Sequence, residues 1–142
     1  MYHFAFHNVL DLPEALVSGR KDLYLQHFYD RLGYRPGAVD VDHYVRLYSQ
    51  AGALRAGFDL YRAFEQDAAD NRHSLKSGGE LTVPVLAFHG EISGFGAVTE
   101  PMARELADEV TVAEVSRTGH SLAEENPDKF VATITRLLSQ RR

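Results

Sequence analysis

The sequence contains no cysteine among its 142 residues. Disulfide bonds, thiol nucleophiles and thiolate metal sites are therefore excluded together. Positive charge is also in the minority, since 15 lysines and arginines stand against 20 acidic residues and leave a net charge of −5. This balance argues against a nucleic-acid partner and against binding to an anionic membrane surface.

Long apolar runs and targeting signals are missing as well. No run approaches the roughly 20 apolar residues that a membrane-spanning helix requires. The first residues, MYHFAFHNVLDLPEAL, lack the basic start and the small-residue cleavage site of a signal peptide. We therefore expect no membrane partner and a cytoplasmic location. Hydrophobic residues make up 44% and charged residues 25% of the chain, which is typical of a globular protein of ordinary domain size.

The first half of the chain shows the apolar spacing of helices. A capping box formed by Asp11 and Glu14 predicts one helix start, and Asp40 predicts another. Further helices are expected over residues 22–32 and from residue 53 to about residue 71. Tyrosines on such helices are more often packed than catalytic, although phenols facing a pocket can donate to a developing oxyanion.

His3 and His7 lie four residues apart and would share one face of a helix. Paired histidines can bind a metal ion, but neither an HExxH pattern nor a nearby acidic partner supports a metal site here. The glycines at positions 90, 94 and 96 do not form the G-x-G-x-x-G pattern of a dinucleotide loop. We therefore expect no metal and no other cofactor.

The character of the sequence changes at the linker predicted over residues 77–80. Residues 81–89 form a near-continuous apolar run typical of a strand in a parallel sheet. A loop follows, then a helix opening at Thr99 or Glu100, and then a short alternating strand over Val110–Val115. This β-α-β-α order predicts parallel strands with a right-handed crossover. We divide the chain into a helical part, residues 1–76, and a β-α-β-α part, residues 77–142.

A single histidine, His120, follows the second predicted strand. Residues 116–119 break that strand, and Asn126 with Pro127 forms the start of a final helix. The imidazole is therefore expected at the carboxyl end of a strand, where open α/β sheets place their sites. A histidine there can shuttle protons, because its ordinary pKa is near neutrality.

Two stretches resemble the C-terminal end of an α/β-hydrolase, namely TVPVLAFHGE and VAEVSRTGHSLAEENPDKF. In that fold the catalytic histidine stands in a Gly-His context before a Glu-x-Pro sequence, which matches His120 and residues 125–127. The helical half resembles the cap of the epoxide hydrolase and haloacetate dehalogenase branch, through residues 3–14 and 58–64. The resemblance covers nearly the whole chain. It implies an α/β protein in which a helical cap precedes the β-α-β-α end of a parallel α/β-hydrolase sheet that is incomplete.

The same resemblance points to a missing nucleophile. The family places a serine in G-x-S-x-G, or an aspartate, after its fifth strand, and the chain order is nucleophile, acid, histidine. Those strands would precede Met1, so the chain is expected to be inactive alone. Ser93 lacks the glycine two residues before it and occupies the usual position of the triad acid. Either Glu91 orients His120 instead, or the acid follows the sixth strand and is absent.

Within the cap, the resemblance assigns substrate contacts to three residues. His3 matches a histidine that binds the leaving group in haloacetate dehalogenases, and Tyr61 matches a tyrosine that contacts it. Phe4 replaces a tryptophan of that branch, and the lost indole N–H argues against fluoride or chloride abstraction. The implied chemistry is carboxylate attack on an epoxide or activated carbon, followed by hydrolysis of the ester with water that His120 activates. Tyr61 would steady the departing oxygen.

Two functions of different classes follow from the sequence. The first is hydrolysis of an epoxide, an ester or a carbon–halogen bond in a small molecule, through a triad of which only His120 is clearly present. The alternative is a non-catalytic interaction module. Residues 83–89 would then expose an apolar strand edge that pairs with a second copy to give a homodimer. A third interpretation, an esterase that uses Ser93, has little support.

Overall fold

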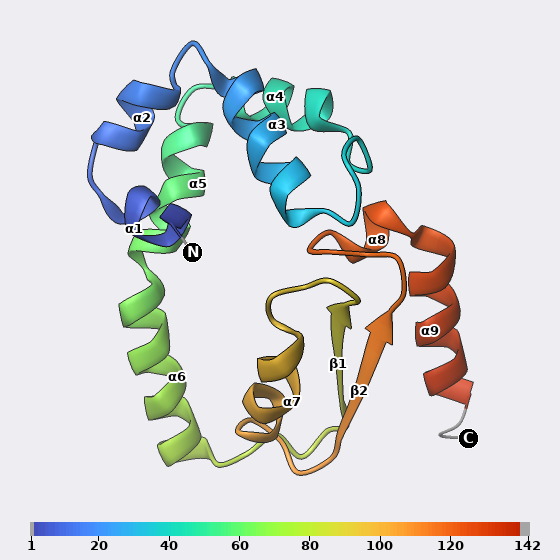
Figure 1. The fold of residues 1–142 in the computed structure, drawn as a ribbon. Helices are drawn as coiled ribbons and strands as arrows, with labels where there is room; N and C mark the ends of the chain where they lie inside the picture. Colours follow the sequence, from blue (N-terminus) through green and yellow to red (C-terminus); the bar gives the residue numbers. More distant parts are fainter. Residues whose placement is uncertain (1, 140–142) are drawn as a thin grey trace. The chain divides into compact units, whose positions relative to one another are not determined.

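The computed structural model describes residues 2–139 and falls into two compact units (Figure 1). The first unit, called here the helical unit, runs up to residue 28 and again from residue 40 to residue 78. The second, called the sheet unit, contains residues 29–39 and the chain from residue 79 onward. The predicted division into residues 1–76 and 77–142 stays a prediction.

The helical unit is built from short helices, as expected for the first half of the chain. The elements are α1 (Tyr2–Asn8), α2 (Leu12–Val17), α3 (Lys21–Leu32), α4 (Val41–Tyr48), α5 (Ala53–Arg62) and α6 (Phe64–Gly78). The last residues of α3 belong to the sheet unit. His3 and His7 on α1 are buried, and so is Phe58 on α5, so these two helices share the core of the unit. The predicted sharing of one helix face by His3 and His7 is confirmed.

Two predictions in the helical unit, the capping box at Asp11 and the single long helix from residue 53, are wrong because of tertiary contacts. Asp11 and Glu14 do not form a capping box, because Asp11 makes no cap hydrogen bond and has a φ of 63°. The Asp11 carboxylate instead pairs with Arg55, and Glu14 pairs with Arg62. By contrast, Asp40 does cap α4 and accepts a hydrogen bond from the His43 N–H at 3.1 Å.

The long helix expected from residue 53 to about residue 71 is in fact two helices. The chain leaves the first at Ala63, although neither glycine nor proline marks this position. Arg62, just before the break, is held by Glu14 and by the Val9 carbonyl. The second helix, α6, continues to Gly78 and therefore takes in the first half of the predicted linker.

The sheet unit has the predicted β-α-β-α order with one additional short helix. Its elements are β1 (Val85–Gly90), α7 (Gly96–Arg104), β2 (Val110–Val115), α8 (Leu122–Glu125) and α9 (Pro127–Ser139). The two strands are parallel, as predicted, and their register runs from Val85 opposite Val110 to Gly90 opposite Val115. The predicted bounds of the second strand and the predicted start of α9 are confirmed.

The starts of two elements in the sheet unit differ from the prediction, and one helix is additional. The strand begins at Val85 and not at residue 81, because Pro84 has no N–H to donate to a neighbouring strand. Leu81 forms only an isolated bridge to Ala107. The next helix begins at Gly96, so that Pro101 lies inside it and not in its first turn. The short helix α8 was not predicted.

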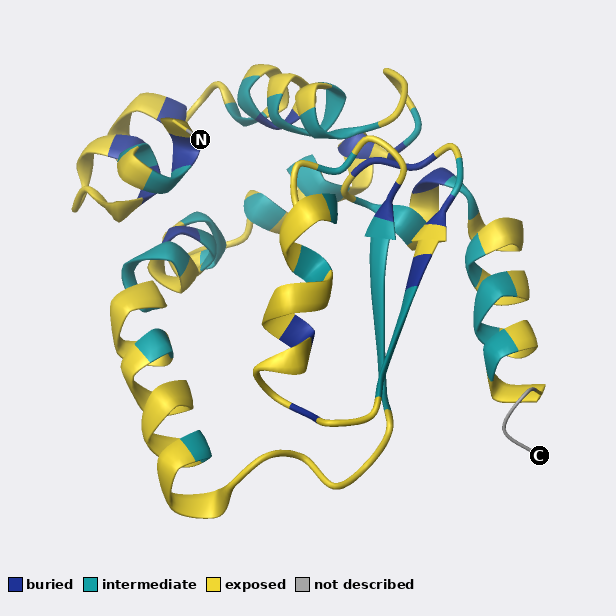
Figure 2. Ribbon diagram, turned by 60° about the horizontal axis from the view of Figure 1, so that its bottom comes forward, coloured by how far each residue is buried: buried dark blue, intermediate teal, exposed yellow. Residues whose placement is uncertain are grey.

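The core of the sheet unit lies between the strands and the helices that flank them (Figure 2). Ala103 and Ala107 from the α7 region and Val115 from β2 are all buried. On α9, Phe130 packs against Phe88 of β1, with ring centroids 5.6 Å apart. Within the described residues, no helix combines the length and the apolar character needed to cross a bilayer.

Candidate functional site

His120 lies in the loop that follows β2, at the carboxyl ends of both parallel strands. Its side chain is exposed, and its ring centroid lies 5.9 Å from that of Phe95 in the loop after β1. An exposed imidazole at this edge of a parallel sheet can exchange protons with a bound molecule or with water. The predicted placement of His120 at the end of a strand is confirmed.

The backbone around His120 is held by three consecutive N–H groups. The His120 N–H donates to the Leu32 carbonyl at 3.0 Å. The N–H groups on either side, those of Gly119 and Ser121, donate to the Glu125 carboxylate at 3.0 Å and 2.9 Å. Each peptide unit that flanks the histidine therefore has a fixed partner.

From the sequence, Glu125 was recognised only as part of the Glu-x-Pro sequence at residues 125–127, and no role was predicted for it. It lies at the end of α8 and is 8% exposed. Its carboxylate also accepts a hydrogen bond from the Tyr34 N–H at 2.5 Å, from a residue 91 positions earlier in the chain. A buried carboxylate requires such donors, since an unpaired buried charge is costly. No local sequence pattern predicts a hydrogen bond between residues so far apart in the chain.

Two glycines make the close approach of these loops possible. A Cβ atom on Gly119 would lie 2.9 Å from the Gly33 carbonyl carbon and nearer still to the Leu32 oxygen. A Cβ atom on Gly90, the last residue of β1, would lie 2.7 Å from the Thr118 oxygen. Real Cβ atoms essentially never come this close to backbone atoms, so both positions require glycine.

Glu91, the candidate orienting acid, lies in the same unit but has another partner. Its carboxylate accepts a hydrogen bond from the Arg117 N–H at 2.8 Å. Arg117 has a φ of 59°, a left-handed conformation that this bond helps to hold. Between Glu91 and His120, the described residues show no hydrogen bond. The Ser93 hydroxyl accepts a hydrogen bond from the Phe95 N–H at 3.2 Å, which is a turn contact.

The three residues predicted to contact substrate in the cap do come together, within the helical unit. The ring centroids of His3 and Tyr61 lie 5.8 Å apart, and those of Phe4 and Tyr61 lie 5.5 Å apart. Both rings meet the Tyr61 ring edge to face, at interplanar angles near 90°. Burial raises the pKa of Tyr61 above its ordinary value, so the phenol keeps its proton and can act as a donor.

A second aromatic pair, His7 with Tyr24, lies next to this cluster. His7 Nε2 forms a hydrogen bond with the Tyr24 hydroxyl, and the His7 ring centroid lies 4.3 Å from that of Tyr61. Burial, helped by the nearby charges of His3 and Arg62, lowers the pKa of His7 to about 4. Burial likewise raises the pKa of Tyr24. The pair is therefore neutral at pH 7. Separately, the described residues contain no group of three or more histidine, cysteine, aspartate or glutamate side chains that could hold a metal ion.

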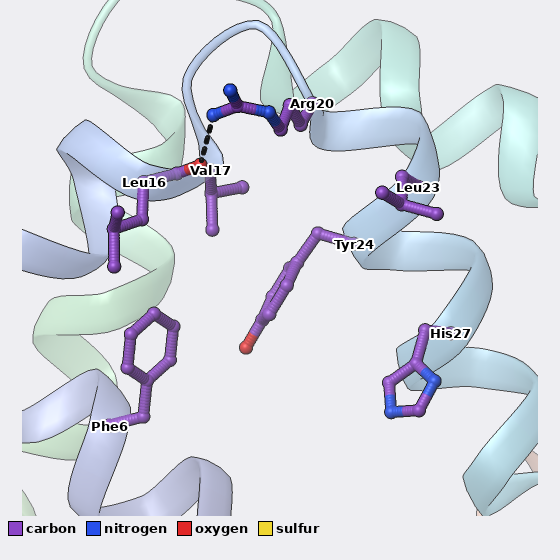
Figure 3. A pocket seen from close by; sticks show the side chains of 7 residues that line it. All are labelled: Phe6, Leu16, Val17, Arg20, Leu23, Tyr24 and His27. Carbon is purple, nitrogen blue, oxygen red and sulfur yellow. Dashed lines mark hydrogen bonds between the residues drawn. The ribbon is translucent and has the colours of Figure 1, made fainter.

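The helical unit also contains a small cavity of about 310 Å³ (Figure 3). Phe6, Leu23 and Tyr24 are among its lining residues, with Arg20 and His27 at its margins, and its walls are mostly apolar. The Arg20 guanidinium donates weakly to the Leu16 carbonyl, at 3.5 Å. The cavity is large enough for a small apolar group, and Tyr24, the hydrogen-bond partner of His7, is one of its lining residues.

No protein-family model matches the chain. The soluble epoxide hydrolase of Corynebacterium sp. strain C12 is 32% identical to it over 137 residues, which cover 92% of this chain and 46% of that protein. The crystal structure of Cfl2 from Burkholderia cenocepacia superimposes with a TM-score of 0.88 at 36% identity, over 96% of this chain and 47% of that one. A putative α/β-hydrolase from Nostoc sp. PCC 7120 gives a TM-score of 0.81 at 29% identity, over 96% and 48%. The chain thus spans about half the length of the proteins it matches.

Proposed function

The chain is an epoxide hydrolase-like α/β-hydrolase sequence that spans about half the length of its relatives, and from this premise we propose that it serves the hydrolysis of an epoxide, an ester or a carbon–halogen bond. Its contribution is the histidine base and the helical cap. The observation that carries the proposal is the loop of His120, which presents an exposed imidazole at the carboxyl ends of two parallel strands.

The proposed reaction has two steps. A carboxylate nucleophile, or a serine whose proton passes to His120 and from there to the leaving oxygen, attacks the substrate carbon as the bond to the leaving oxygen or halide breaks. Tyr61 then donates a hydrogen bond to the departing oxygen, with His3 beside it and Phe4 as an apolar wall. In the second step, His120 takes a proton from water as that water attacks the covalent ester, and the nucleophile is released.

The nucleophile of this scheme is supplied from outside these 142 residues. The sequence contains no G-x-S-x-G elbow, and the Ser93 hydroxyl is engaged in a turn. We therefore propose that the chain alone is inactive. Glu91 serves as the orienting acid only if its carboxylate exchanges the Arg117 N–H for the imidazole; otherwise the acid also comes from outside. The location proposed is cytoplasmic, and the partner is a small-molecule substrate.

Two assays test the proposal. The purified chain is assayed with styrene oxide, a haloacetate and a nitrophenyl ester, and no turnover is expected. In the second assay, the chain is co-expressed with the half of the Corynebacterium hydrolase that lies outside the matched 137 residues. Turnover is expected in that mixture, lost in His120→Ala and kept in His73→Ala, whose side chain is exposed on α6. Activity of the mixture that survives His120→Ala would refute the role of His120.

A second candidate function rests on the open edge of β1. Among the described residues β1 pairs only with β2. The Val85 and Glu91 N–H groups donate toward β2. Strand alternation therefore leaves the main-chain groups of Leu86 and Phe88 facing the other edge. A non-catalytic module would pair through this edge with a second copy. Sedimentation velocity would then show a homodimer, and a monomer at every micromolar concentration tested would exclude it.

A further inference from the structure

We propose that Glu125 is the positioning residue of the His120 loop, and that its carboxylate fixes the position of the His120 imidazole. This inference rests on the proposed role of His120 as the base. It concerns a residue that does not touch the reacting atoms, since Glu125 is buried while the His120 side chain is exposed. Its effect on His120 is transmitted through the backbone.

The first argument is the pattern of hydrogen bonds on the two sides of the histidine. Oε1 of Glu125 accepts from the Gly119 N–H at 3.0 Å and from the Ser121 N–H at 2.9 Å. The Ser121 N–H belongs to the peptide unit that directly follows His120, and the Gly119 N–H belongs to the peptide unit that precedes Gly119, so both bonds limit rotation of the backbone close to His120. One carboxylate therefore restrains the chain on both sides of the residue that carries the imidazole.

The second argument is that the same carboxylate anchors the loop to a distant segment. Oε2 accepts from the Tyr34 N–H, two residues beyond Leu32, whose carbonyl accepts the His120 N–H. The turn after α3 and the histidine loop thus meet at Glu125, and they lie beside each other in Figure 1. Without this anchor the loop would keep only one backbone bond to the segment 32–34.

The third argument is that neither water nor a neutral side chain replaces the carboxylate well. Water has little access, because Glu125 is 8% exposed and the neighbouring Thr118 and Gly119 are buried. The missing side chain of Gly119 lets the Leu32 and Gly33 backbone close over the loop. A neutral side chain offers fewer lone pairs than the four that a carboxylate provides, and charge-assisted bonds are the stronger ones.

The test compares Glu125→Gln and Glu125→Asp with Glu124→Gln, a matched control on an exposed position of the same short helix. Glutamine keeps the length but offers one acceptor oxygen. Aspartate keeps the charge but is one methylene shorter. Amide hydrogen exchange of the full chain is followed by NMR at Tyr34 and at residues 119–121, with the amides of β2 as an internal reference. The contact between the His120 and Phe95 rings is followed in the same spectra.

In both Glu125 variants, the amides of Tyr34, Gly119 and Ser121 should exchange at least about 10-fold faster than in the control, relative to β2. The contact between the His120 and Phe95 rings should weaken with them. Glu124→Gln should leave both readouts unchanged. Unaltered protection of the three amides, or an equal rise across β2, would overturn the proposal. Global unfolding of both variants would assign Glu125 to fold stability alone and would also overturn it. None of these measurements needs turnover, so failure here is distinct from failure of the proposed function.

Discussion

Acidification should destabilise the helical unit through His7, one of its two buried histidines. Its imidazole is 3% exposed and forms a hydrogen bond with the Tyr24 hydroxyl. Among the described residues, the buried Nδ1 of the same ring has no hydrogen-bond partner, so the charged ring would gain no further bond to offset its desolvation. A fall in pH from 7 to about 4.5 should expose this cost.

The sign and size of the effect follow from the two pKa values. His7 has a pKa of about 4 in the folded chain against an ordinary value of 6.5, so between these values the unfolded chain binds more protons. The stability that His7 contributes is therefore complete above pH 6.5 and is lost as the pH falls toward 4. Full linkage would give about 2.5 kcal/mol at about pH 4.5, and we expect about 2 kcal/mol because solvent screens part of the charge.

Urea unfolding followed by far-ultraviolet circular dichroism measures this loss, because most of the helix content lies in the helical unit. His7→Gln should flatten the pH dependence between 6.5 and 4, since glutamine can still form a hydrogen bond with Tyr24 but does not titrate. His73→Gln, at an exposed position on α6, should keep the wild-type dependence. Identical pH profiles for wild type and His7→Gln would show that His7 does not cause the loss of stability.

Three further outcomes are expected in the same unfolding assay. Gly119→Ala should cost about 2–3 kcal/mol because its Cβ would overlap backbone atoms, whereas Gly94→Ala, with open space around it, should change little. Arg62→Met should cost about 2 kcal/mol, because Glu14 loses two hydrogen bonds in a largely buried pair; an unchanged midpoint would contradict this. Asp40→Ala should cost about 1 kcal/mol by removing the cap of α4, and Asp40→Asn should restore it.

The parts of the site that the sequence predicted are those that local patterns determine. The strand Val110–Val115 was predicted from its alternation, and the start of α9 from Asn126 and Pro127. The position of His120 at the strand end followed from these two elements. The grouping of His3 with Tyr61 came from family resemblance, since 58 residues separate them in the chain and no periodicity joins them.

The parts that were missed depend on contacts between distant segments. Glu125 meets Tyr34 across 91 residues, and His7 meets Tyr24 across 17. The break at Ala63 carries no helix-breaking residue, and Arg62 beside it is held by Glu14. Asp11 satisfies the capping-box pattern but pairs with Arg55 instead. In each case a side chain takes a partner from a distant part of the chain.

Most of the elements and their order could therefore be predicted from the sequence, because helix caps, strand alternation and proline positions act over a few residues. The sequence also determined that a lone histidine follows the last strand. Only the tertiary structure decided what holds that histidine. The buried N–H groups of the loop must find an acceptor, and the acceptor they share, Glu125, also binds the segment after α3. That choice depends on burial and close backbone approach, which no local pattern encodes.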